Sequence, residues 1–297
     1  MKKVCISGCG DIGQRVAKRY LKDATHSNTK VEVYGLTRRE EVRHQLQEIG
    51  IKPVIADLDQ PVSLAKLPSK GATLLHLAPP PGTGQTDPRF RTLLHACNQS
   101  GLPAKIILLS TTAVYGDCQG NWIDESEPVN PQTDRGRRRL DAENALREWA
   151  NEYQVPYAIL RVSGIYGPGR LPVERLKKGL PILQEEQAPF SNRIHQDDLA
   201  MVCVAAAERA PNSAIYNVCD GHPSTMSHYF KSVAAAVGLP LPPEIDREQA
   251  QKELSAGMLS YLNESRRMHN TKLLQGLGII LQYPDLAAGL ANLHLQS

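Results

Sequence analysis

The stretch Val4-Cys5-Ile6-Ser7-Gly8-Cys9-Gly10-Asp11-Ile12-Gly13 decides the fold of this chain. Its first four residues form a short apolar run that is typical of a buried strand, and a helical pattern follows from about residue 12 to 21. Glycines at 8, 10 and 13 permit a tight turn, close approach of a pyrophosphate and close packing of helix on strand. The free N–H groups of the helix start favour an anion. We therefore predict that a dinucleotide is bound by Gly8, Gly10, Asp11, Ile12 and Gly13.

Apolar runs typical of strands alternate with helical segments along the first half of the chain. After the first strand, they cover residues 31–36, 52–57, 72–78, 105–110 and 157–161. Continuous β-rich runs separated by helices indicate a parallel sheet that is buried on both faces. We therefore predict an α/β fold with a Rossmann-type doubly wound parallel sheet, in which ligands bind beyond the carboxyl ends of the strands.

The pattern changes after about Gly164. Glycines and prolines interrupt the next segment, then a helix near 194–209 and a strand near 215–218 resume the first pattern, and a further helical stretch is expected near 249–262. We predict a dinucleotide-binding domain over 1–165, completed by about 190–220. A small C-terminal α/β substrate lobe would then consist of 166–189 and 221–297.

Composition argues against several classes of function. The 297 residues are 41% hydrophobic and 22% charged with a net charge of +3, which gives no general case for nucleic acid or an anionic membrane as partner. The six cysteines lack paired metal-ligand spacing, so we predict no metal site and a reducing compartment, with Cys203 and Cys219 as core thiols. The sequence contains no run of about 20 apolar residues, the length that a membrane-spanning helix needs. We expect a cytoplasmic monomer or homodimer that acts on a small molecule.

The end of the second strand bears on the choice of cofactor. A site that prefers NAD places an acidic residue there to receive the ribose 2′-hydroxyl. This strand instead ends in Thr37-Arg38-Arg39, and Glu32 comes too early. Two arginines suit the 2′-phosphate of NADP, although they could also simply begin the next helix. We predict NADP, with NAD as the alternative. Asp57, which precedes Leu58, is placed either to accept a hydrogen bond from adenine or to cap a helix.

Several further motifs follow in a recognisable order: Leu77-Ala78 after the fourth strand, residues 109–116 after the fifth, then 164–169 and 193–200. Together with the glycine loop they resemble the extended short-chain dehydrogenase/reductase superfamily, of the NAD-dependent epimerase/dehydratase type. The resemblance covers nearly the whole chain. It implies that Thr111 orients a substrate oxygen. It also implies further cofactor contacts from Leu77, Ala78, Pro79 and Ile165.

The segment Arg135-Gly136-Arg137-Arg138-Arg139 stands where that family carries a Tyr-x-x-x-Lys pair. The resemblance implies that the tyrosine exchanges a proton and that the lysine binds the nicotinamide ribose. A guanidinium has a pKa above about 12 and cannot give up a proton near neutrality. Arg135 therefore cannot replace the phenol, whereas Arg139 can still bind ribose hydroxyls. The chain thus resembles atypical members of the superfamily that lack the pair. Other candidate proton donors are Tyr115, Tyr166, His195 and Asp134, although the resemblance implies packing or turn roles for the two tyrosines and His195.

Two hypotheses of function follow. The first is an NADP-dependent oxidoreductase or epimerase that acts on a small sugar or sugar-nucleotide-like molecule, with Thr111, Arg135 and Arg139 in the active site. Arg135, Arg161, Arg170 and Arg193 would then be available to recognise an acidic or phosphorylated substrate. The alternative is a catalytically silent protein that binds NADP(H) and acts as a sensor or regulator. A retained cofactor loop beside an altered catalytic pair is compatible with both.

Overall fold

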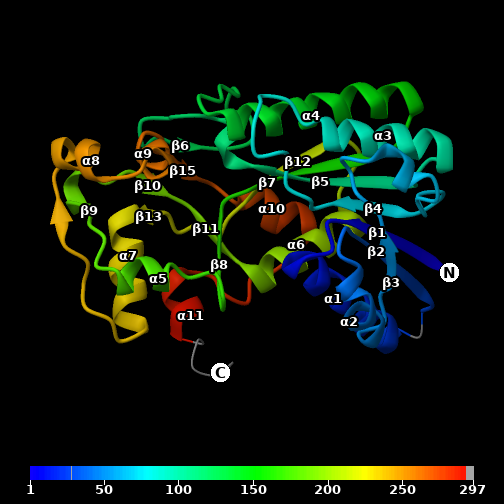
Figure 1. Ribbon diagram of the computed structural model, residues 1–297, viewed down its shortest axis with the longest axis horizontal. Coiled ribbons are helices and arrows are strands. Elements are labelled where there is room, and N and C mark those ends of the chain that lie inside the picture. Colours follow the sequence, from blue (N-terminus) through cyan, green and yellow to red (C-terminus); the bar gives the residue numbers. More distant parts are fainter. Residues whose placement is uncertain (28, 292–297) are drawn as a thin grey trace.

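A parallel sheet of seven strands forms the centre of the larger of two lobes (Figure 1). The structure is a computed structural model that describes residues 1–27 and 29–291. The strand order is β12-β7-β5-β4-β1-β2-β3, and every neighbouring pair is parallel. The strands are β1 (Lys2–Ser7), β2 (Val31–Thr37), β3 (Lys52–Ile55), β4 (Thr73–His76), β5 (Lys105–Thr111), β7 (Tyr157–Val162) and β12 (Ala214–Val218).

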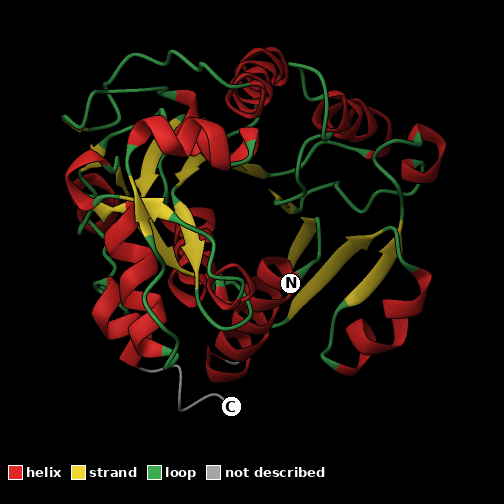
Figure 2. Cartoon of the chain, turned by 60° about the vertical axis from the view of Figure 1, so that its left-hand side comes forward, coloured by secondary structure: helices red, strands yellow, loops and turns green. Residues whose placement is uncertain are grey.

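Helices cover both faces of this sheet, which confirms the predicted doubly wound α/β fold (Figure 2). Alternate residues of β1 show why: Val4 and Ile6 pack into one core cluster and Cys5 into the other. One face is covered by α1 (Asp11–Ser27), α2 (Arg43–Glu48), α6 (Gln196–Arg209) and α10 (Thr271–Leu277). The other face is covered by α3 (Pro88–Ser100) and α4 (Asp134–Tyr153). Short 3₁₀ turns are η1 (Glu40–Val42), η2 (Pro61–Leu64) and η3 (Thr112–Val114).

The smaller lobe lies beyond the carboxyl ends of the central strands, on the left in Figure 1. Its helices pack around two apolar clusters that are separate from the core of the large sheet. They are α5 (Val173–Lys177), α7 (Met226–Ala236), α8 (Arg247–Glu253), α9 (Ala256–Leu262) and α11 (Leu286–Ala291), with the 3₁₀ turn η4 (Glu185–Gln187). Two-residue strands pair as β6 (Trp122–Ile123) with β15 (Arg267–Met268), β9 (Ile182–Leu183) with β14 (Glu244–Ile245), and β10 (Phe190–Ser191) with β13 (Ser224–Thr225). Between the lobes, β8 (Gly164–Tyr166) pairs with β11 (Arg193–His195).

Two local features differ from the sequence-based expectation. The helical stretch expected near 249–262 is divided, because Leu254 is extended and Ser255 begins a second helix by accepting a hydrogen bond from the backbone N–H of Met258. The segment 271–281, expected in the substrate lobe, returns to the large sheet, where Leu273 and Leu277 pack in its core. Tertiary packing decides this second point, since the segment is short and carries no fold signal of its own.

The topology places the site. In the sheet order, β1 and β4 are neighbours, and the chain runs outward from them in opposite directions. Loops that leave their carboxyl ends therefore diverge and leave a crevice, which is where open α/β sheets bind ligands. The glycine loop follows β1 at this point, and Thr111 ends β5, the neighbour of β4 in the sheet.

Candidate functional site

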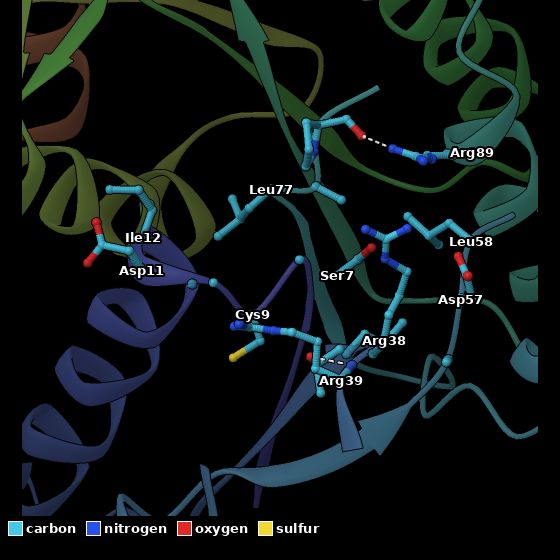
Figure 3. A pocket seen from close by; sticks show the side chains of 18 of the residues that line it. Ser7, Cys9, Asp11, Ile12, Arg38, Arg39, Asp57, Leu58, Leu77 and Arg89 are labelled. Atoms are coloured by element: carbon cyan, nitrogen blue, oxygen red, sulfur yellow. Dashed lines mark hydrogen bonds between the residues drawn. The ribbon is translucent and has the colours of Figure 1, made fainter. Parts of the chain in front are cut away.

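A cavity of about 340 Å³ opens at the carboxyl ends of β1, β2 and β4; we call it the first cavity (Figure 3). All but two of the residues predicted to bind the cofactor line it. These are Gly8, Gly10, Asp11, Ile12, Gly13, Thr37, Arg38, Arg39, Asp57, Leu58, Leu77, Ala78 and Pro79. They come from four separate segments, which the fold brings together around one cavity.

The three glycines of the loop serve different purposes. Gly8 has φ +93°, and a Cβ built on it would lie 2.5 Å from the backbone nitrogen of Ala78. A Cβ on Gly13 would lie 2.7 Å from the carbonyl oxygen of Gly8. Both positions therefore need glycine for packing within the protein. Gly10 is exposed, and a Cβ there would meet nothing within 4 Å. This open space at the start of α1 fits a pyrophosphate, which would approach the free N–H groups of the helix.

The end of β2 presents cations to the first cavity. The Arg38 guanidinium points to the side where Asp57 and Leu58 lie (Figure 3), and its single ion contact, to Asp59, is long at 4.0 Å. The backbone N–H of Arg39 donates to Thr37 Oγ1 at 3.2 Å, which fixes the turn after the strand. Glu32 is not among the residues that line this cavity and instead pairs with Lys52.

Asp57 has a local role besides lining the cavity. One of its carboxylate oxygens accepts the backbone N–H of Asp59 at 3.0 Å. The cap position of the next turn is Gln60, so Asp57 is not a helix cap. The other carboxylate oxygen accepts no hydrogen bond from the described part of the chain and is free to accept one from a ligand such as adenine.

Two arginines of the first cavity were not predicted there. Arg89, on α3, makes a bidentate contact with Asp59 at 2.8 and 2.6 Å and also donates to the carbonyl oxygen of Pro79. A signal for it exists in the sequence, because Asp87-Pro88 marks a helix start soon after β4. The other, Arg170, follows β8. The remaining unpredicted lining residues flank predicted ones: Ser7, Cys9, Leu36 and Ala56.

Arg170 is engaged by an acidic side chain of the protein. It was considered for substrate recognition, yet its Nε and Nη2 both lie 2.9 Å from a carboxylate oxygen of Asp11 at the rim of the first cavity. Partial burial acts to raise the pKa of Asp11, but hydrogen bonds from Arg170 and Arg15 outweigh it and hold this pKa below its usual value. The contact joins the loop after β8 to the start of α1.

A second cavity, of about 270 Å³, lies over the carboxyl ends of β5 and β7 and extends into the smaller lobe. It brings together the predicted residues Thr111 and Arg135 with Arg193. Thr111 is half-buried at the end of β5, where its hydroxyl accepts the backbone N–H of Ala113 at 3.4 Å. Because β5 neighbours β4, this cavity lies beside the first along the same edge of the sheet.

Arg135 is engaged by the smaller lobe. Its Nη1 donates to Ser260 Oγ at 2.8 Å, and its guanidinium lies 3.8 Å from the ring centroid of Tyr261. Its Nη2 is also 3.7 Å from a carboxylate oxygen of Glu264. The side chain thus connects α4 to the segment around α9 and forms part of the cavity wall.

Arg139 and Ile165, the other two predicted cofactor contacts, are not among the lining residues of either cavity. The Arg139 guanidinium donates to the carbonyl oxygen of Ala78 at 3.2 Å and lies 3.7 Å from Asp87. Burial lowers its pKa to about 10. Ile165 is partly buried against the core of the large sheet. Arg139 thus contacts a lining residue of the first cavity, and Ile165 packs against the sheet core beside it. Direct contact of either side chain with a cofactor stays a prediction.

The other residues considered as proton donors are engaged elsewhere. Tyr115 and Tyr166 donate their hydroxyl hydrogens to protein oxygens at 2.7 and 3.0 Å. His195 is 1% exposed and accepts a backbone N–H at the start of α6. Asp134 pairs with a neighbouring arginine on the exposed start of α4. None of the four lines the second cavity as far as the described residues define it.

The expectation that Arg161 recognises a substrate is wrong, because this side chain is buried and paired inside the protein. It is 3% exposed, and its Nε and Nη2 donate to the two carboxylate oxygens of Glu143 at 3.1 and 2.9 Å. Ser110 donates to the same carboxylate at 2.6 Å. This buried, neutralised network holds α4 against β5 and β7.

Other sequence-based expectations concern residue chemistry. All six cysteines are free thiols and buried, so the prediction of core thiols at Cys203 and Cys219 is confirmed. Within the described residues, no group of three or more His, Cys, Asp or Glu side chains could hold a metal ion. Over the same residues, no helix has the length and apolar character needed to cross a membrane.

The fold and the first cavity define a two-lobed α/β protein with a dinucleotide-type glycine loop. Residues 4–219 match the NAD dependent epimerase/dehydratase family, and the chain belongs to that family. Protein YeeZ of Escherichia coli strain K12 is 28% identical, over 96% of this chain and 97% of that protein. The dTDP-L-rhamnose 4-epimerase of Burkholderia thailandensis is 24% identical, over 81% and 83% of the two chains.

Solved structures extend the likeness to the whole fold. A functionally unknown conserved protein from Silicibacter pomeroyi superposes with a TM-score of 0.81 at 28% identity, covering 100% of this chain and 99% of that one. The dTDP-glucose 4,6-dehydratase DesIV of Streptomyces venezuelae, solved with NAD and TYD bound, has a TM-score of 0.78 at 20% identity, covering 99% and 95%. At that identity the likeness concerns the fold alone.

Proposed function

We propose that this protein binds NADP(H) in the first cavity and acts as an oxidoreductase or epimerase on a small sugar or sugar-nucleotide-like molecule in the second. The observation that carries the proposal is the open space at Gly10 beside the start of α1, with Arg38 and Arg39 at the end of the next strand. The two cavities lie along one edge of the sheet, over neighbouring strands. A cofactor and a substrate bound there would be adjacent.

Each part of the first cavity suits one part of the cofactor. The N–H groups around Gly10 and Ile12 would hold the pyrophosphate, and the carboxylate of Asp57 would accept a hydrogen bond from adenine. Arg38 and Arg39 would bind the 2′-phosphate. The bound cofactor would supply hydride transfer. In the second cavity, the Thr111 hydroxyl would orient a substrate oxygen toward it.

The proposed preference for NADP over NAD rests on the positive charge at the end of β2. The family takes its description from NAD, and relatives such as DesIV were solved with NAD. An NAD site needs a carboxylate for the 2′-hydroxyl, which a 2′-phosphate would repel. Here Asp59 is paired with Arg89, and the residues that follow directly at the end of β2, Arg38 and Arg39, are cationic.

A second candidate function is an NADP(H) sensor without turnover. Its support is the engagement of Arg135 by Ser260 and Glu264, which places an inter-lobe contact where catalysis would need an acid or base. Occupancy of the first cavity could then be transmitted to the smaller lobe through this contact.

Nucleotide binding and turnover test both candidates. NADP⁺ and NADPH are titrated calorimetrically into the wild-type protein, Gly10→Ala and Gly10→Glu, with circular dichroism to monitor folding. We expect Gly10→Glu to abolish binding, because it puts bulk and negative charge in the pyrophosphate space. Gly10→Ala should retain much more affinity. Undiminished binding by Gly10→Glu would remove the loop from the site.

Turnover then separates the two candidates. NADPH oxidation is followed with carbonyl compounds and sugar nucleotides. Oxidation that depends on the added compound supports an oxidoreductase. An epimerase returns its cofactor unchanged, so the sugar nucleotides are also analysed for epimer formation, and a blank in both assays counts against the enzyme. Equal affinity for NADP⁺ and NADPH would exclude the sensor, because a ligand pair bound equally well shifts no equilibrium.

A further inference from the structure

Arg193 is a buried cation whose hydrogen-bonding groups are largely unused. The residue is 7% exposed, and its Nε and Nη2 have no hydrogen-bond partner within the described residues. Its Nη1 makes one long contact, 3.4 Å to the carbonyl oxygen of Asn192. Among these residues no carboxylate lies within 4.0 Å of the guanidinium, and the buried carboxylate of Asp220 acts on it only from farther away. A buried charge normally has a partner, because desolvation without one is costly.

The guanidinium is held in place by packing. It lies 3.8 Å from the ring centroid of Tyr229, a geometry that favours a cation over the ring face. Its space is provided by Gly164, since a Cβ at that position would be 2.8 Å from Arg193 Nη1. A glycine at 164 and an arginine at 193 are thus a structural pair, and the fork of the guanidinium is fixed at the wall of the second cavity.

The surroundings of Arg193 in the second cavity add to its positive character. Three arginines line this cavity, Arg135, Arg193 and Arg266, with Glu264 as the one acidic residue among the lining residues. Glu264 is 3.0 Å from Arg266 and 3.7 Å from Arg135, so it does not compensate Arg193.

Ser163 supplies a second unused group to the same cavity. Its residue is 8% exposed, and its hydroxyl has no partner among the described residues. Ser163 and Arg193 both line the second cavity, and Ser163 directly follows Val162, the partner of Thr111 in the sheet. Two buried polar side chains without partners, both on one cavity, point to a ligand that satisfies them.

We propose that the second cavity is anchored by an anion: the Arg193 guanidinium and the Ser163 hydroxyl bind a compact carboxylate or phosphate group of the substrate. This inference rests on the proposed function and specifies its substrate class. A planar fork of N–H donors matches carboxylate and phosphate oxygens. At about 270 Å³ the cavity is at the small end of ligand pockets, which favours a small hydroxylated acid or sugar phosphate. Its other end would lie near Thr111.

Calorimetric titration with small anions tests the anchor. Inorganic phosphate and D-glycerate serve as probes of the two anion types, and glycerol serves as the neutral probe. Because phosphate could also enter the first cavity, each titration is repeated in the Gly10→Glu background. We expect phosphate or glycerate to bind with glycerol silent; the stronger of the two identifies the anion type. Binding of glycerol as strong as that of both anions would overturn the proposal.

Variants assign the binding to Arg193. We expect affinity for the preferred anion to fall at least about tenfold in Arg193→Gln and to stay within about twofold in the control Arg175→Gln. Arg175 is a matched control because it also lies over an aromatic ring of α7, that of Phe230, but does not line the second cavity. Gly164→Ala keeps the charge but displaces the guanidinium, so it should weaken the anion as well.

The outcomes are separable from those of the proposed function. Unchanged anion affinity in both Arg193→Gln and Gly164→Ala would overturn the anchor, even if NADP⁺ binds normally. Conversely, loss of anion affinity in these two variants supports the anchor even if NADP⁺ fails to bind, because the titrations need no cofactor. If Arg193→Gln does not fold, Gly164→Ala alone decides, since it leaves the buried arginine in the chain.

Discussion

Replacement of Arg38 by alanine is a direct test of cofactor choice. The side chain lines the first cavity and is 62% exposed, and its one ion contact is the 4.0 Å approach to Asp59. Because Arg38 has no short ion pair with any described residue, the substitution mainly changes what the guanidinium does for a bound nucleotide. We expect a loss of NADP⁺ affinity with little change in NAD⁺ affinity.

The size of the loss follows from exposure. A hydrogen bond to a charged group contributes about 1.5–3 kcal/mol, and an exposed group belongs at the lower end because water and salt screen it. Arg38→Ala should therefore weaken NADP⁺ binding by about 1.5 kcal/mol, slightly more than tenfold. Removing Arg39 as well should about double the loss in free energy. NAD⁺ has a hydroxyl in place of the phosphate and should change by less than about twofold.

The assay is calorimetric titration of both nucleotides at low salt and at about 0.5 M salt, where screening should reduce the difference. Arg43→Ala is the matched control, because Arg43 is exposed, follows β2 closely and pairs with Glu40 away from the first cavity. An equal loss of NADP⁺ and NAD⁺ affinity in Arg38→Ala would refute the reasoning, since Arg38 would then read something other than the 2′ position.

Three further predictions concern the protein itself. Gly13→Ala should lower the free energy of unfolding by about 1–3 kcal/mol, because its Cβ would be 2.7 Å from a backbone oxygen, whereas Gly10→Ala should not; equal urea midpoints would contradict this. Arg139→Ala should lower the free energy of unfolding, measured with urea, by about 3 kcal/mol, because the buried guanidinium lies 3.7 Å from the carboxylate of Asp87 and compensates its charge. A variant as stable as the wild type would exclude that role. Burial raises the pKa of Asp220 to about 7, and the unfolded carboxyl titrates near about 3.9. Ionisation therefore favours the unfolded chain, so stability should fall as pH rises from about 4 to 7 in the wild type but not in Asp220→Asn; parallel pH profiles of unfolding would argue against it.

The residues of the first cavity could be predicted largely from the sequence. Its residues are at strand ends and in the turns that follow them, and parallel strands bring all their carboxyl ends to one edge of the sheet. Local signals therefore suffice to place Gly10, Arg38 and Asp57 in the same site. Arg89 and Arg170 were not placed there, because each reaches the cavity from another part of the chain, and their acidic partners Asp59 and Asp11 are distant in sequence.

Two arginines, Arg161 and Arg193, show why the role of a charged residue could not be predicted from the sequence. In the sequence, Arg161 and Arg193 both adjoin apolar runs and are equally suited to bind an anion. In the fold, Glu143 pairs directly with Arg161 inside the core, whereas no described carboxylate lies within 4.0 Å of Arg193 and a glycine makes room for it at a cavity. Local patterns are enough to predict the sheet, the glycine loop and the cationic end of β2, because periodicity and turn chemistry depend on neighbouring residues. Only the tertiary structure decided which cations face a ligand, because a charge is compensated by whatever long-range packing brings within a few ångströms.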